Sequence, residues 1–282
     1  MIKPIKYLYA LRDLQRITIS LSRAAATAPL RKIDPQNPLS WEFSGFSQHG
    51  EDGIIDYLIE NIRESNRYFV EIGSGNGMEN NTSWLAVAKY YQGLMIDGGK
   101  NNIEWCKYLL HPMNYGLDFK QIFVSKENIN EIVGLMQTKQ PDFFSLDIDG
   151  IDYYICQELL IHGVRPGIWA LEYNSAFGPE IIVTVKYKRN FYRGNEGFGK
   201  LYYGCSLSAW KQLMAKNDYR FVSVDSCGVN AFFVDVDRFE KSFLGNLKGL
   251  EFRENIVQRK EFVLDWKGQF EKIKEYPLEY DL

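Results

Sequence analysis

The feature that most constrains this chain is a short apolar run that ends in an acid and in three glycines at alternate positions. The run is Tyr68-Phe69-Val70-Glu71-Ile72-Gly73-Ser74-Gly75-Asn76-Gly77. Continuous β-branched and aromatic residues are typical of a buried parallel strand, and the glycines allow a tight turn that brings a ligand close to bare backbone. The stretch therefore predicts a nucleoside-binding turn in an α/β protein. An ordinary glycine-rich turn is the alternative.

The spacing of the glycines separates two kinds of nucleoside site. Dinucleotide-binding folds use G-x-G-x-x-G, whereas this chain has G-x-G-x-G. Glu71 lies two residues before the first glycine, where its charge would repel a pyrophosphate but favour a sulfonium cation. At these residues the sequence resembles the class I methyltransferases that use S-adenosylmethionine, whose first motif has the form E/D-x-G-x-G-x-G. The resemblance implies cofactor contacts from Glu71, Gly73, Ser74, Gly75 and Asn76.

Composition bounds the size of the protein and the partners it can have. A chain of 282 residues with 45% hydrophobic content is long enough for one main domain with additions. Residues 1–32 carry seven Lys or Arg against one acid, so the net charge of −3 leaves an acidic body, which argues against a nucleic-acid partner. Four dispersed cysteines and three histidines argue against a zinc site and suit a reducing compartment. We therefore expect a cytoplasmic protein.

The two ends of the chain are predicted to be additions to this domain. Residues 2–26 predict a basic amphipathic helix, interrupted by too many charges to be a signal peptide or a membrane span. It could pack on its own domain, on a second copy in a homodimer, or on a membrane surface. We expect residues 1–45 to form this helix and a linker, residues 46–240 the cofactor-binding domain, and residues 241–282 a C-terminal helical extension. Within the extension, Asn255 to Ile273 predicts one helix.

A polar cluster precedes the helix that begins near Ile54. The cluster is Ser47-Gln48-His49-Gly50-Glu51-Asp52. One interpretation is helix capping by Ser47 or Asp52. The other follows from a resemblance to the FkbM-like methyltransferases, a subgroup named for O-methylation, in which a Ser-Gln-x-x-Glu-Asp region precedes the first motif. This resemblance implies cofactor contacts from Gln48 and Glu51.

Two further positions are candidates for the nucleoside. Residues 93–98 predict a second strand that ends in Asp97, and an acid there accepts hydrogen bonds from ribose hydroxyls in doubly wound nucleoside folds. The alternative for Asp97 is a turn aspartate. A third strand is expected at Gln121–Val124. By resemblance to methyltransferases, Ser125 after it would touch adenine, and a helix N-cap is compatible with that role.

Acids and an amide end the next two predicted strands. They are Asp147, Asp149 and Asp152 after one strand, and Glu172 and Asn174 after the other. Carboxyl ends of neighbouring parallel strands meet at one edge of the sheet, so we expect these side chains close together. By resemblance to some O-methyltransferases, Asp147, Glu172 and Asn174 would hold Mg²⁺. Alternatively, the acids bind the methionine ammonium, cap the next helix or remove a proton. Asp149, His49 and Asp147 are the catalytic candidates.

Four more segments carry the resemblance to FkbM-like enzymes. They are residues 146–153, 171–179, 202–207 and 228–233. The resemblance spans residues 46–236 and implies S-adenosylmethionine as the cofactor.

The last two predicted strands support the same fold class independently. Residues 219–224 and 231–236 are joined by a loop too short for a crossover helix, so the two strands must be antiparallel. Such a pair agrees with the architecture that the resemblance to class I methyltransferases implies, a Rossmann-like, seven-stranded, mostly parallel sheet with a terminal antiparallel hairpin. A dinucleotide domain would more often continue with a helix and a parallel strand.

A long insertion follows the fifth strand, at residues 175–205. Loops at the carboxyl edge usually connect in 2–6 residues and carry function when longer. This one is rich in basic and aromatic residues, so we expect a lid over a small molecule or saccharide with an anionic group. The alternative is a hairpin arm packed on the body. The predicted substrate-binding residues are Tyr173, Asn174, Arg189, Arg193 and Tyr203.

Two other functions remain open. One is a nicotinamide-dependent oxidoreductase or epimerase, disfavoured by the glycine spacing, by Glu71 and by the final hairpin. The other is a non-catalytic scaffold with a methyltransferase-like fold.

Overall fold

The structure is a computed structural model that describes residues 31–194, 197 and 199–282, together with Leu11, Leu14, Ile17, Thr18 and Leu21. The predicted N-terminal helix therefore lies mostly outside the described residues. Ile17 is buried and belongs to the same core cluster as Trp41 and Met78. No helix among the described residues is both long and apolar enough to cross a membrane.

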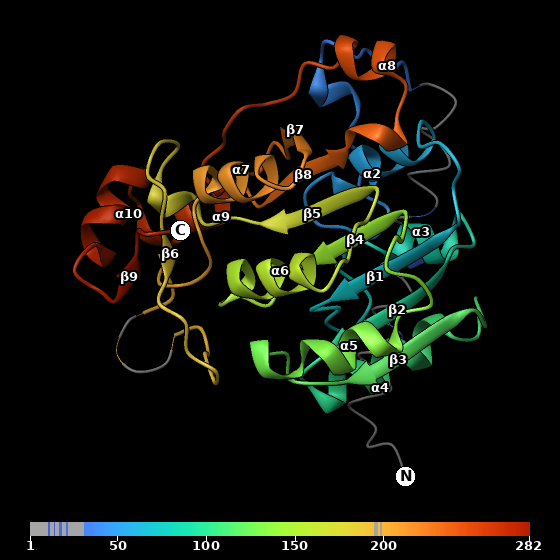
Figure 1. Ribbon diagram of the computed structural model, residues 1–282, viewed down its shortest axis with the longest axis horizontal. Coiled ribbons are helices and arrows are strands. Elements are labelled where there is room, and N and C mark those ends of the chain that lie inside the picture. Colours follow the sequence, from blue (N-terminus) through green and yellow to red (C-terminus); the bar gives the residue numbers. More distant parts are fainter. Residues whose placement is uncertain are drawn as a thin grey trace.

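Seven strands form one sheet in the order β3-β2-β1-β4-β5-β8-β7 (Figure 1). Their bounds are β1 Tyr68–Ile72, β2 Gln92–Asp97, β3 Leu117–Gln121, β4 Phe143–Leu146, β5 Ile168–Glu172, β7 Tyr219–Val224 and β8 Asn230–Asp235. The first five strands pair in parallel, and β8 is antiparallel to both β5 and β7. This confirms the predicted fold class, an α/β, Rossmann-like, mostly parallel seven-stranded sheet with a terminal antiparallel hairpin.

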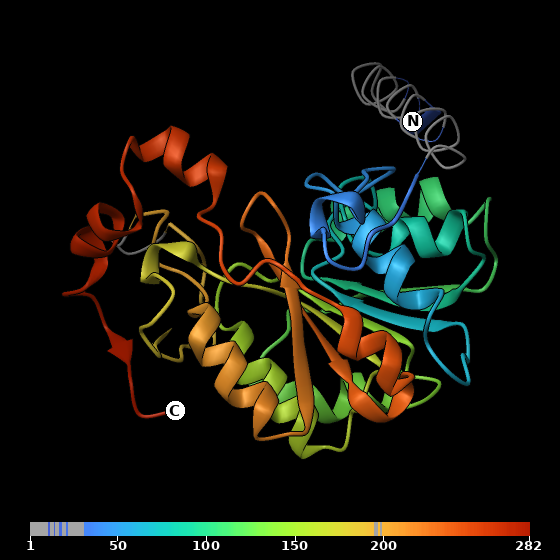
Figure 2. The ribbon, with the colours of Figure 1, turned by 90° about the horizontal axis from the view of Figure 1, so that it is seen from above.

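Helices cover both faces of the sheet (Figures 1 and 2). Those that precede or accompany the sheet are α2 Glu51–Ile59, α3 Ser83–Val87, α4 Lys100–Leu110, α5 Ile129–Leu135, α6 Asp152–Ile161, α7 Leu207–Ala215 and α8 Lys241–Asn246. Side chains from α5, α6 and α7 join one core cluster, and those from α2, α3, α4 and α8 join another. Single 3₁₀ turns occupy Pro38–Ser40, Lys126–Asn128, Ser175–Phe177 and Val236–Arg238. The fold is thus a three-layer sandwich.

Alternation along β1 decides which way its acid points. Val70 and Ile72 belong to the core under α5, α6 and α7, whereas Phe69 belongs to the core under α2, α3 and α4. Successive side chains of a strand point to opposite faces, so Glu71 shares the face of Phe69. Glu71 is therefore directed toward the side of the sheet where α2 and α3 begin.

The third strand differs from its prediction. It spans Leu117–Gln121 instead of Gln121–Val124, because its ladder pairs Gly93 with Leu117 and ends where β2 ends, at Asp97. The apolar residues Ile122, Phe123 and Val124 leave the sheet and line a cavity. These residues are apolar because they line the cavity. The sequence pattern alone does not distinguish such residues from those of a buried strand.

The C-terminal extension also differs from its prediction. The expected helix from Asn255 to Ile273 is two helices, α9 Ile256–Phe262 and α10 Trp266–Ile273. Val263 between them has a φ of 53°, a left-handed conformation that ends α9. Asp265 then begins α10 by accepting a hydrogen bond from the Gly268 amide at 2.9 Å.

The insertion and the C-terminal extension form one structure beside the main sheet. β6 Thr184–Val185 pairs antiparallel with β9 Leu278–Glu279 (Figure 1). A third core cluster joins Phe177, Val185 and Leu201 of the insertion to Ile273 of α10. Contacts with α10 and β9 of the C-terminal extension therefore fix the position of the insertion.

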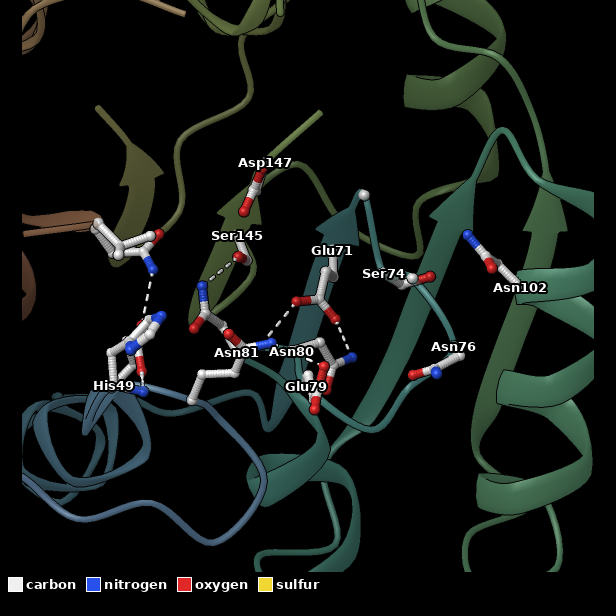
Figure 3. Close-up of a pocket in the computed structure, with 16 residues that line it drawn as sticks. His49, Glu71, Ser74, Asn76, Glu79, Asn80, Asn81, Asn102, Ser145 and Asp147 are labelled. Carbon is white, nitrogen blue, oxygen red and sulfur yellow. Dashed lines mark hydrogen bonds between the residues drawn. The ribbon is translucent and has the colours of Figure 1, made fainter. Parts of the chain in front are cut away.

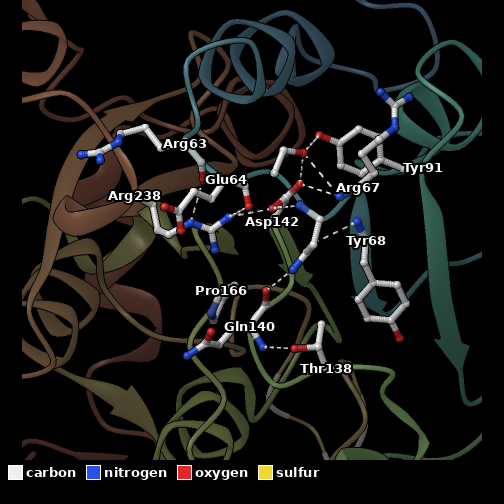
Figure 4. A network of polar contacts seen from close by, with 12 residues as sticks. Arg63, Glu64, Arg67, Tyr68, Tyr91, Thr138, Gln140, Asp142, Pro166 and Arg238 are labelled. Atoms are coloured by element: carbon white, nitrogen blue, oxygen red, sulfur yellow. Dashed lines mark hydrogen bonds and ion pairs between the residues drawn. The ribbon is translucent and has the colours of Figure 1, made fainter.

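A buried carboxylate joins three strands at the edge of the sheet opposite to the glycine turn (Figure 4). Asp142, just before β4, is fully buried and accepts hydrogen bonds from the Ser65 hydroxyl at 2.5 Å and the Arg67 amide at 2.9 Å, both just before β1. Arg238, just after β8, forms an ion pair with it at 2.9 Å. Because breaking a buried pair costs about 3–5 kcal/mol, this network fixes the ends of β1, β4 and β8.

Candidate functional site

The glycine turn after β1 exposes backbone to a ligand. Gly73 has a φ of +90°, and a Cβ atom there would lie 1.5 Å from the carbonyl oxygen of Asp147, so no other residue fits. Gly75 has a φ of +54°, and a Cβ atom there would have no neighbour within 4 Å. The turn is thus closed against β4 at Gly73 and open at Gly75.

Two cavities meet over this turn. The larger, of about 780 Å³, lies beyond the ends of β2, β3 and β4, and the smaller, of about 380 Å³, lies between the turn and the start of α2. Both are lined by Gly73, Gly75, Asn102 and Asp147. A single elongated ligand can therefore occupy both.

Asp97, the predicted ribose ligand, ends β2 and lines the larger cavity. Its Oδ1 accepts hydrogen bonds from the Gly99 amide at 2.7 Å and the Asn102 side chain at 3.0 Å. Its Oδ2 accepts one, from the Gly75 amide at 2.9 Å. A carboxylate has about four acceptor positions, so Oδ2 keeps one for a ligand.

Glu71 lines the smaller cavity and is buried (Figure 3). Its oxygens accept hydrogen bonds from the Asn80 side chain at 2.6 Å, the Thr82 hydroxyl at 2.6 Å and the Asn81 amide at 3.0 Å. Burial raises the pKa of Glu71 to about 7, although these hydrogen bonds act to lower the pKa. Glu71 therefore holds the 80–82 turn in place, a role that the motif alone does not indicate.

The members of the cluster before α2 divide between the start of the helix and the smaller cavity. Asp52 is fully buried and accepts hydrogen bonds from the amides of Gly45, Phe46 and Ser47, and the Ser47 hydroxyl accepts one from the Asp52 amide. Burial raises the pKa of Asp52 to about 7. Gln48, His49 and Glu51 line the smaller cavity instead. Capping and the site thus use different members of the cluster.

Three carboxylates gather at the ends of β4 and β5. Ligand atoms of Asp147, Asp149 and Glu172 lie within 4.8 Å of one another. Burial, and then the charges of the neighbouring acids, raise the pKa of Asp147 to about 8 and raise the pKa of Glu172 well above its ordinary value. Glu172 Oε2 is buried without a hydrogen-bond partner in the described part of the chain. Such a group is compatible with a shared proton or a cation.

Asn174 is not part of this cluster, contrary to the predicted metal set. Its side chain donates to the carbonyl oxygens of Leu201 at 2.7 Å and Tyr203 at 3.0 Å, and accepts from the Ala176 amide at 3.0 Å. Asn174 is fully buried and ties the start of the insertion to its end. Asp149 takes the place expected for Asn174.

Three basic residues of the insertion are paired with acids within the protein. Arg193 forms an ion pair with Asp149 and lies over the Tyr203 ring, 3.7 Å from its centroid. Arg189 lies 3.7 Å from Glu127 and lines neither cavity. Lys200, which lines the larger cavity, lies 3.0 Å from Glu261.

Three other predicted contacts lie outside the two cavities. Tyr173 is buried, and its hydroxyl donates to the Arg253 carbonyl at 2.6 Å. Tyr203 is buried and accepts a hydrogen bond from Gln258 at 2.7 Å. Ser125 caps the 3₁₀ turn at Lys126–Asn128, so the neighbouring Phe123 and Val124 line the cavity in its place.

Several cavity residues were not predicted from the sequence. They are Glu79, Asn80, Asn81, Asn102, Ser145 and Asn230. Four of them are polar residues that follow a glycine turn or a strand end, and this position could have indicated that they lie at the site. Figure 3 shows Asn81 bonded to Ser145, a contact of 3.0 Å that joins the turn after β1 to β4.

The known proteins that this chain is similar to are solved structures of low sequence identity. No family profile and no curated protein matches the sequence. Among solved structures, an O-methyltransferase from Bacillus cereus in complex with S-adenosylhomocysteine is 15% identical, with 78% of this chain and 89% of that chain covered and a TM-score of 0.45. A SAM-dependent methyltransferase from Aquifex aeolicus is 10% identical, with coverages of 72% and 98% and a TM-score of 0.41. The CurJ carbon methyltransferase is 11% identical, with coverages of 82% and 69% and a TM-score of 0.44.

Proposed function

We propose that the protein is an S-adenosylmethionine-dependent O-methyltransferase that acts on a small molecule or saccharide. One observation carries the proposal. The larger cavity runs from the Asp97 carboxylate to the open glycine turn and continues into a second cavity lined by acids. This shape suits a nucleoside with a cationic tail better than it suits a dinucleotide, whose pyrophosphate would lie against acids.

The cofactor would lie with its nucleoside in the larger cavity and its amino-acid part directed toward the smaller one. The free acceptor position of Asp97 suits a ribose hydroxyl, and the apolar residues Ile122, Phe123 and Val124 suit the adenine ring. The amino-acid part then crosses Gly73 and Gly75. The sulfonium would lie beside Asp147, where its positive charge would favour the ionised form of that acid.

The reaction would be an in-line transfer. The acceptor oxygen bonds to the methyl carbon as the carbon–sulfur bond breaks, which leaves neutral S-adenosylhomocysteine, and the hydroxyl proton passes to a base. Asp149, Asp147 and His49 remain the candidates for that base, and all three line one of the cavities. If the reaction required a divalent cation, Asp147, Asp149 and Glu172 would hold it and it would lower the pKa of the acceptor hydroxyl.

We further propose that the acceptor carries an anionic group. Arg193 and Lys200 line the larger cavity and supply the positive charge. Both are paired with acids, so an anion would replace Asp149 or Glu261 as their partner. Arg189 is not included, because it lies outside the cavity lining.

Calorimetric titration with S-adenosylhomocysteine and, separately, with NAD⁺ tests the cofactor class. We expect the first to bind, and we expect Asp97→Ala to weaken it about 10- to 100-fold through loss of hydrogen bonds to a charged group. Asp118→Ala is the matched control, because Asp118 is an exposed acid on the neighbouring strand. Repeating the titrations with EDTA tests the cation.

Two results would reject the proposal. Binding of NAD⁺ alone would change the reaction class and leave the fold intact. Binding of neither compound would favour the scaffold function.

A further inference from the structure

The smaller cavity is acidic. Its lining includes Glu51, Glu71, Glu79 and Asp147, and among the described residues it includes no Lys or Arg. Glu51 is 2% exposed. A carboxylate in a partly enclosed space attracts a cationic group.

The acids of this cavity differ in what they can still accept. Glu71 already accepts three hydrogen bonds from the 80–82 turn. Glu51 accepts the His49 amide at 2.7 Å on one oxygen and the Asn230 side chain at 3.1 Å on the other. A carboxylate has about four acceptor positions, so Glu51 keeps one on each oxygen.

Asn230 provides an independent sign of a missing donor. It is 3% exposed and lines the same cavity, and its Oδ1 is buried without a hydrogen-bond partner in the described part of the chain. The amide cannot be flipped to relieve this, because its nitrogen donates to the Glu51 carboxylate. A buried acceptor without a donor is destabilising, so a ligand that brings an N–H group would satisfy it.

The arrangement of the two cavities indicates which ligand can supply this N–H group. They share Gly73 and Gly75, so a nucleoside held at Asp97 extends over the turn toward Glu51. We infer that Glu51 and Asn230 form an ammonium subsite, which binds the amino group of the methionyl part of the cofactor. The inference rests on the proposed function. It assigns the amino group to residues from α2 and β8, distant in sequence from the glycine turn.

Four compounds test the subsite by calorimetry. They are S-adenosylhomocysteine, its decarboxylated form, its deaminated form and 5′-methylthioadenosine, which lacks the whole amino-acid part. In Glu51→Gln we expect the first two, which keep the ammonium, to bind at least about 10-fold more weakly than to the unmodified protein. The other two should change less than about 2-fold. Glu60→Gln removes the same charge at the exposed end of α2 and should change none of the four.

The same panel distinguishes the possible failures. Equal losses for all four compounds would show that Glu51 only supports the fold of the site, and no loss for any of them would reject the cofactor's amino group as the ligand. Both results overturn the inference. If none of the four bound the unmodified protein, the proposed function itself would fail and take the subsite with it. Asn230→Ser, expected to show the same selective loss, serves if Glu51→Gln does not fold.

Discussion

Glu71 controls the shape of the smaller cavity through the turn that it holds. Three donors from residues 80–82 converge on its carboxylate, and the Asn81 side chain continues the network to Ser145 on β4. Asn80 and Asn81 of this turn line one wall of the cavity. Any change at Glu71 therefore acts on ligand binding through the position of this wall.

The raised pKa of Glu71 predicts a dependence of stability on pH. Between about pH 4.5, the ordinary pKa of a glutamate, and its folded pKa of about 7, the native carboxyl keeps its proton while the unfolded one loses it. Unfolding then releases a proton, so the free energy of unfolding falls as pH rises through this window and is constant above it. The slope is at most about 1.4 kcal/mol per pH unit for one group.

Urea unfolding at pH 5, 6, 7 and 8 measures this effect. Glu71→Gln should flatten the decline between pH 5 and 7, and Glu104→Gln, at an exposed site on α4, should not. Burial also raises the pKa of Asp52, Asp147 and Asp225, so part of the decline remains in the variant. Identical pH profiles for Glu71→Gln and the unmodified protein would contradict this account.

The sequence predicted the acids of the site better than their partners. Glu71 and Asp97 were recognisable because each ends an apolar strand, and the edge at which parallel strands end follows from the fold. Asn230 was not recognisable, because its place beside Glu51 depends on the antiparallel register of β8 with β5. Asn174 was misassigned because strand position does not show that its side chain satisfies backbone groups of the insertion.

At the scale of elements, residues 187–193 of the insertion form a strap along the larger cavity. The Tyr187 hydroxyl donates to Glu127 at 2.9 Å, and Arg189 lies 3.7 Å from the same carboxylate. Further along, Phe191 packs against Gly150, and Arg193 pairs with Asp149. The strap is thus attached to the loop after β3 and to the loop after β4.

We expect the attachment at Glu127 to slow release of the nucleoside. Glu127→Arg should raise the rate of S-adenosylhomocysteine release about 2- to 5-fold, the range expected for an exposed ion pair. Arg189→Glu should act in the same direction, and combining both changes should restore the slow rate. Neither residue lines a cavity, so the chemistry of the site is unchanged.

Stopped-flow measurement of release checks this prediction. Single variants that release the ligand at the unmodified rate would contradict it, as would a double variant as fast as the singles. The sequence predicted a long insertion here but not its attachment, because a two-residue strand such as β6 has no recognisable period, and its partner β9 is 93 residues away in numbering, from Val185 to Leu278.

At the scale of the whole molecule, the network that stabilises the fold and the residues of the candidate site lie at opposite ends of the parallel strands. The buried Asp142 network (Figure 4) lies where the parallel strands begin, and the glycine turn, Asp97 and the carboxylate cluster lie where they end. The mostly parallel sheet and the final hairpin followed from the pattern of strands and loop lengths. The shape of the cavities did not, because it depends on where residues 122–124 and 187–193 lie after they leave the regular elements.

The most direct test of the account is the crystal structure of the complex with S-adenosylhomocysteine. We predict the ribose hydroxyls on the Asp97 carboxylate, the adenine beside Phe123, and the amino-acid part over Gly73 and Gly75 with its amino group toward Glu51. A nucleoside bound elsewhere, with Asp97 free of ribose, would contradict the assignment of the site and of the reaction class drawn from it.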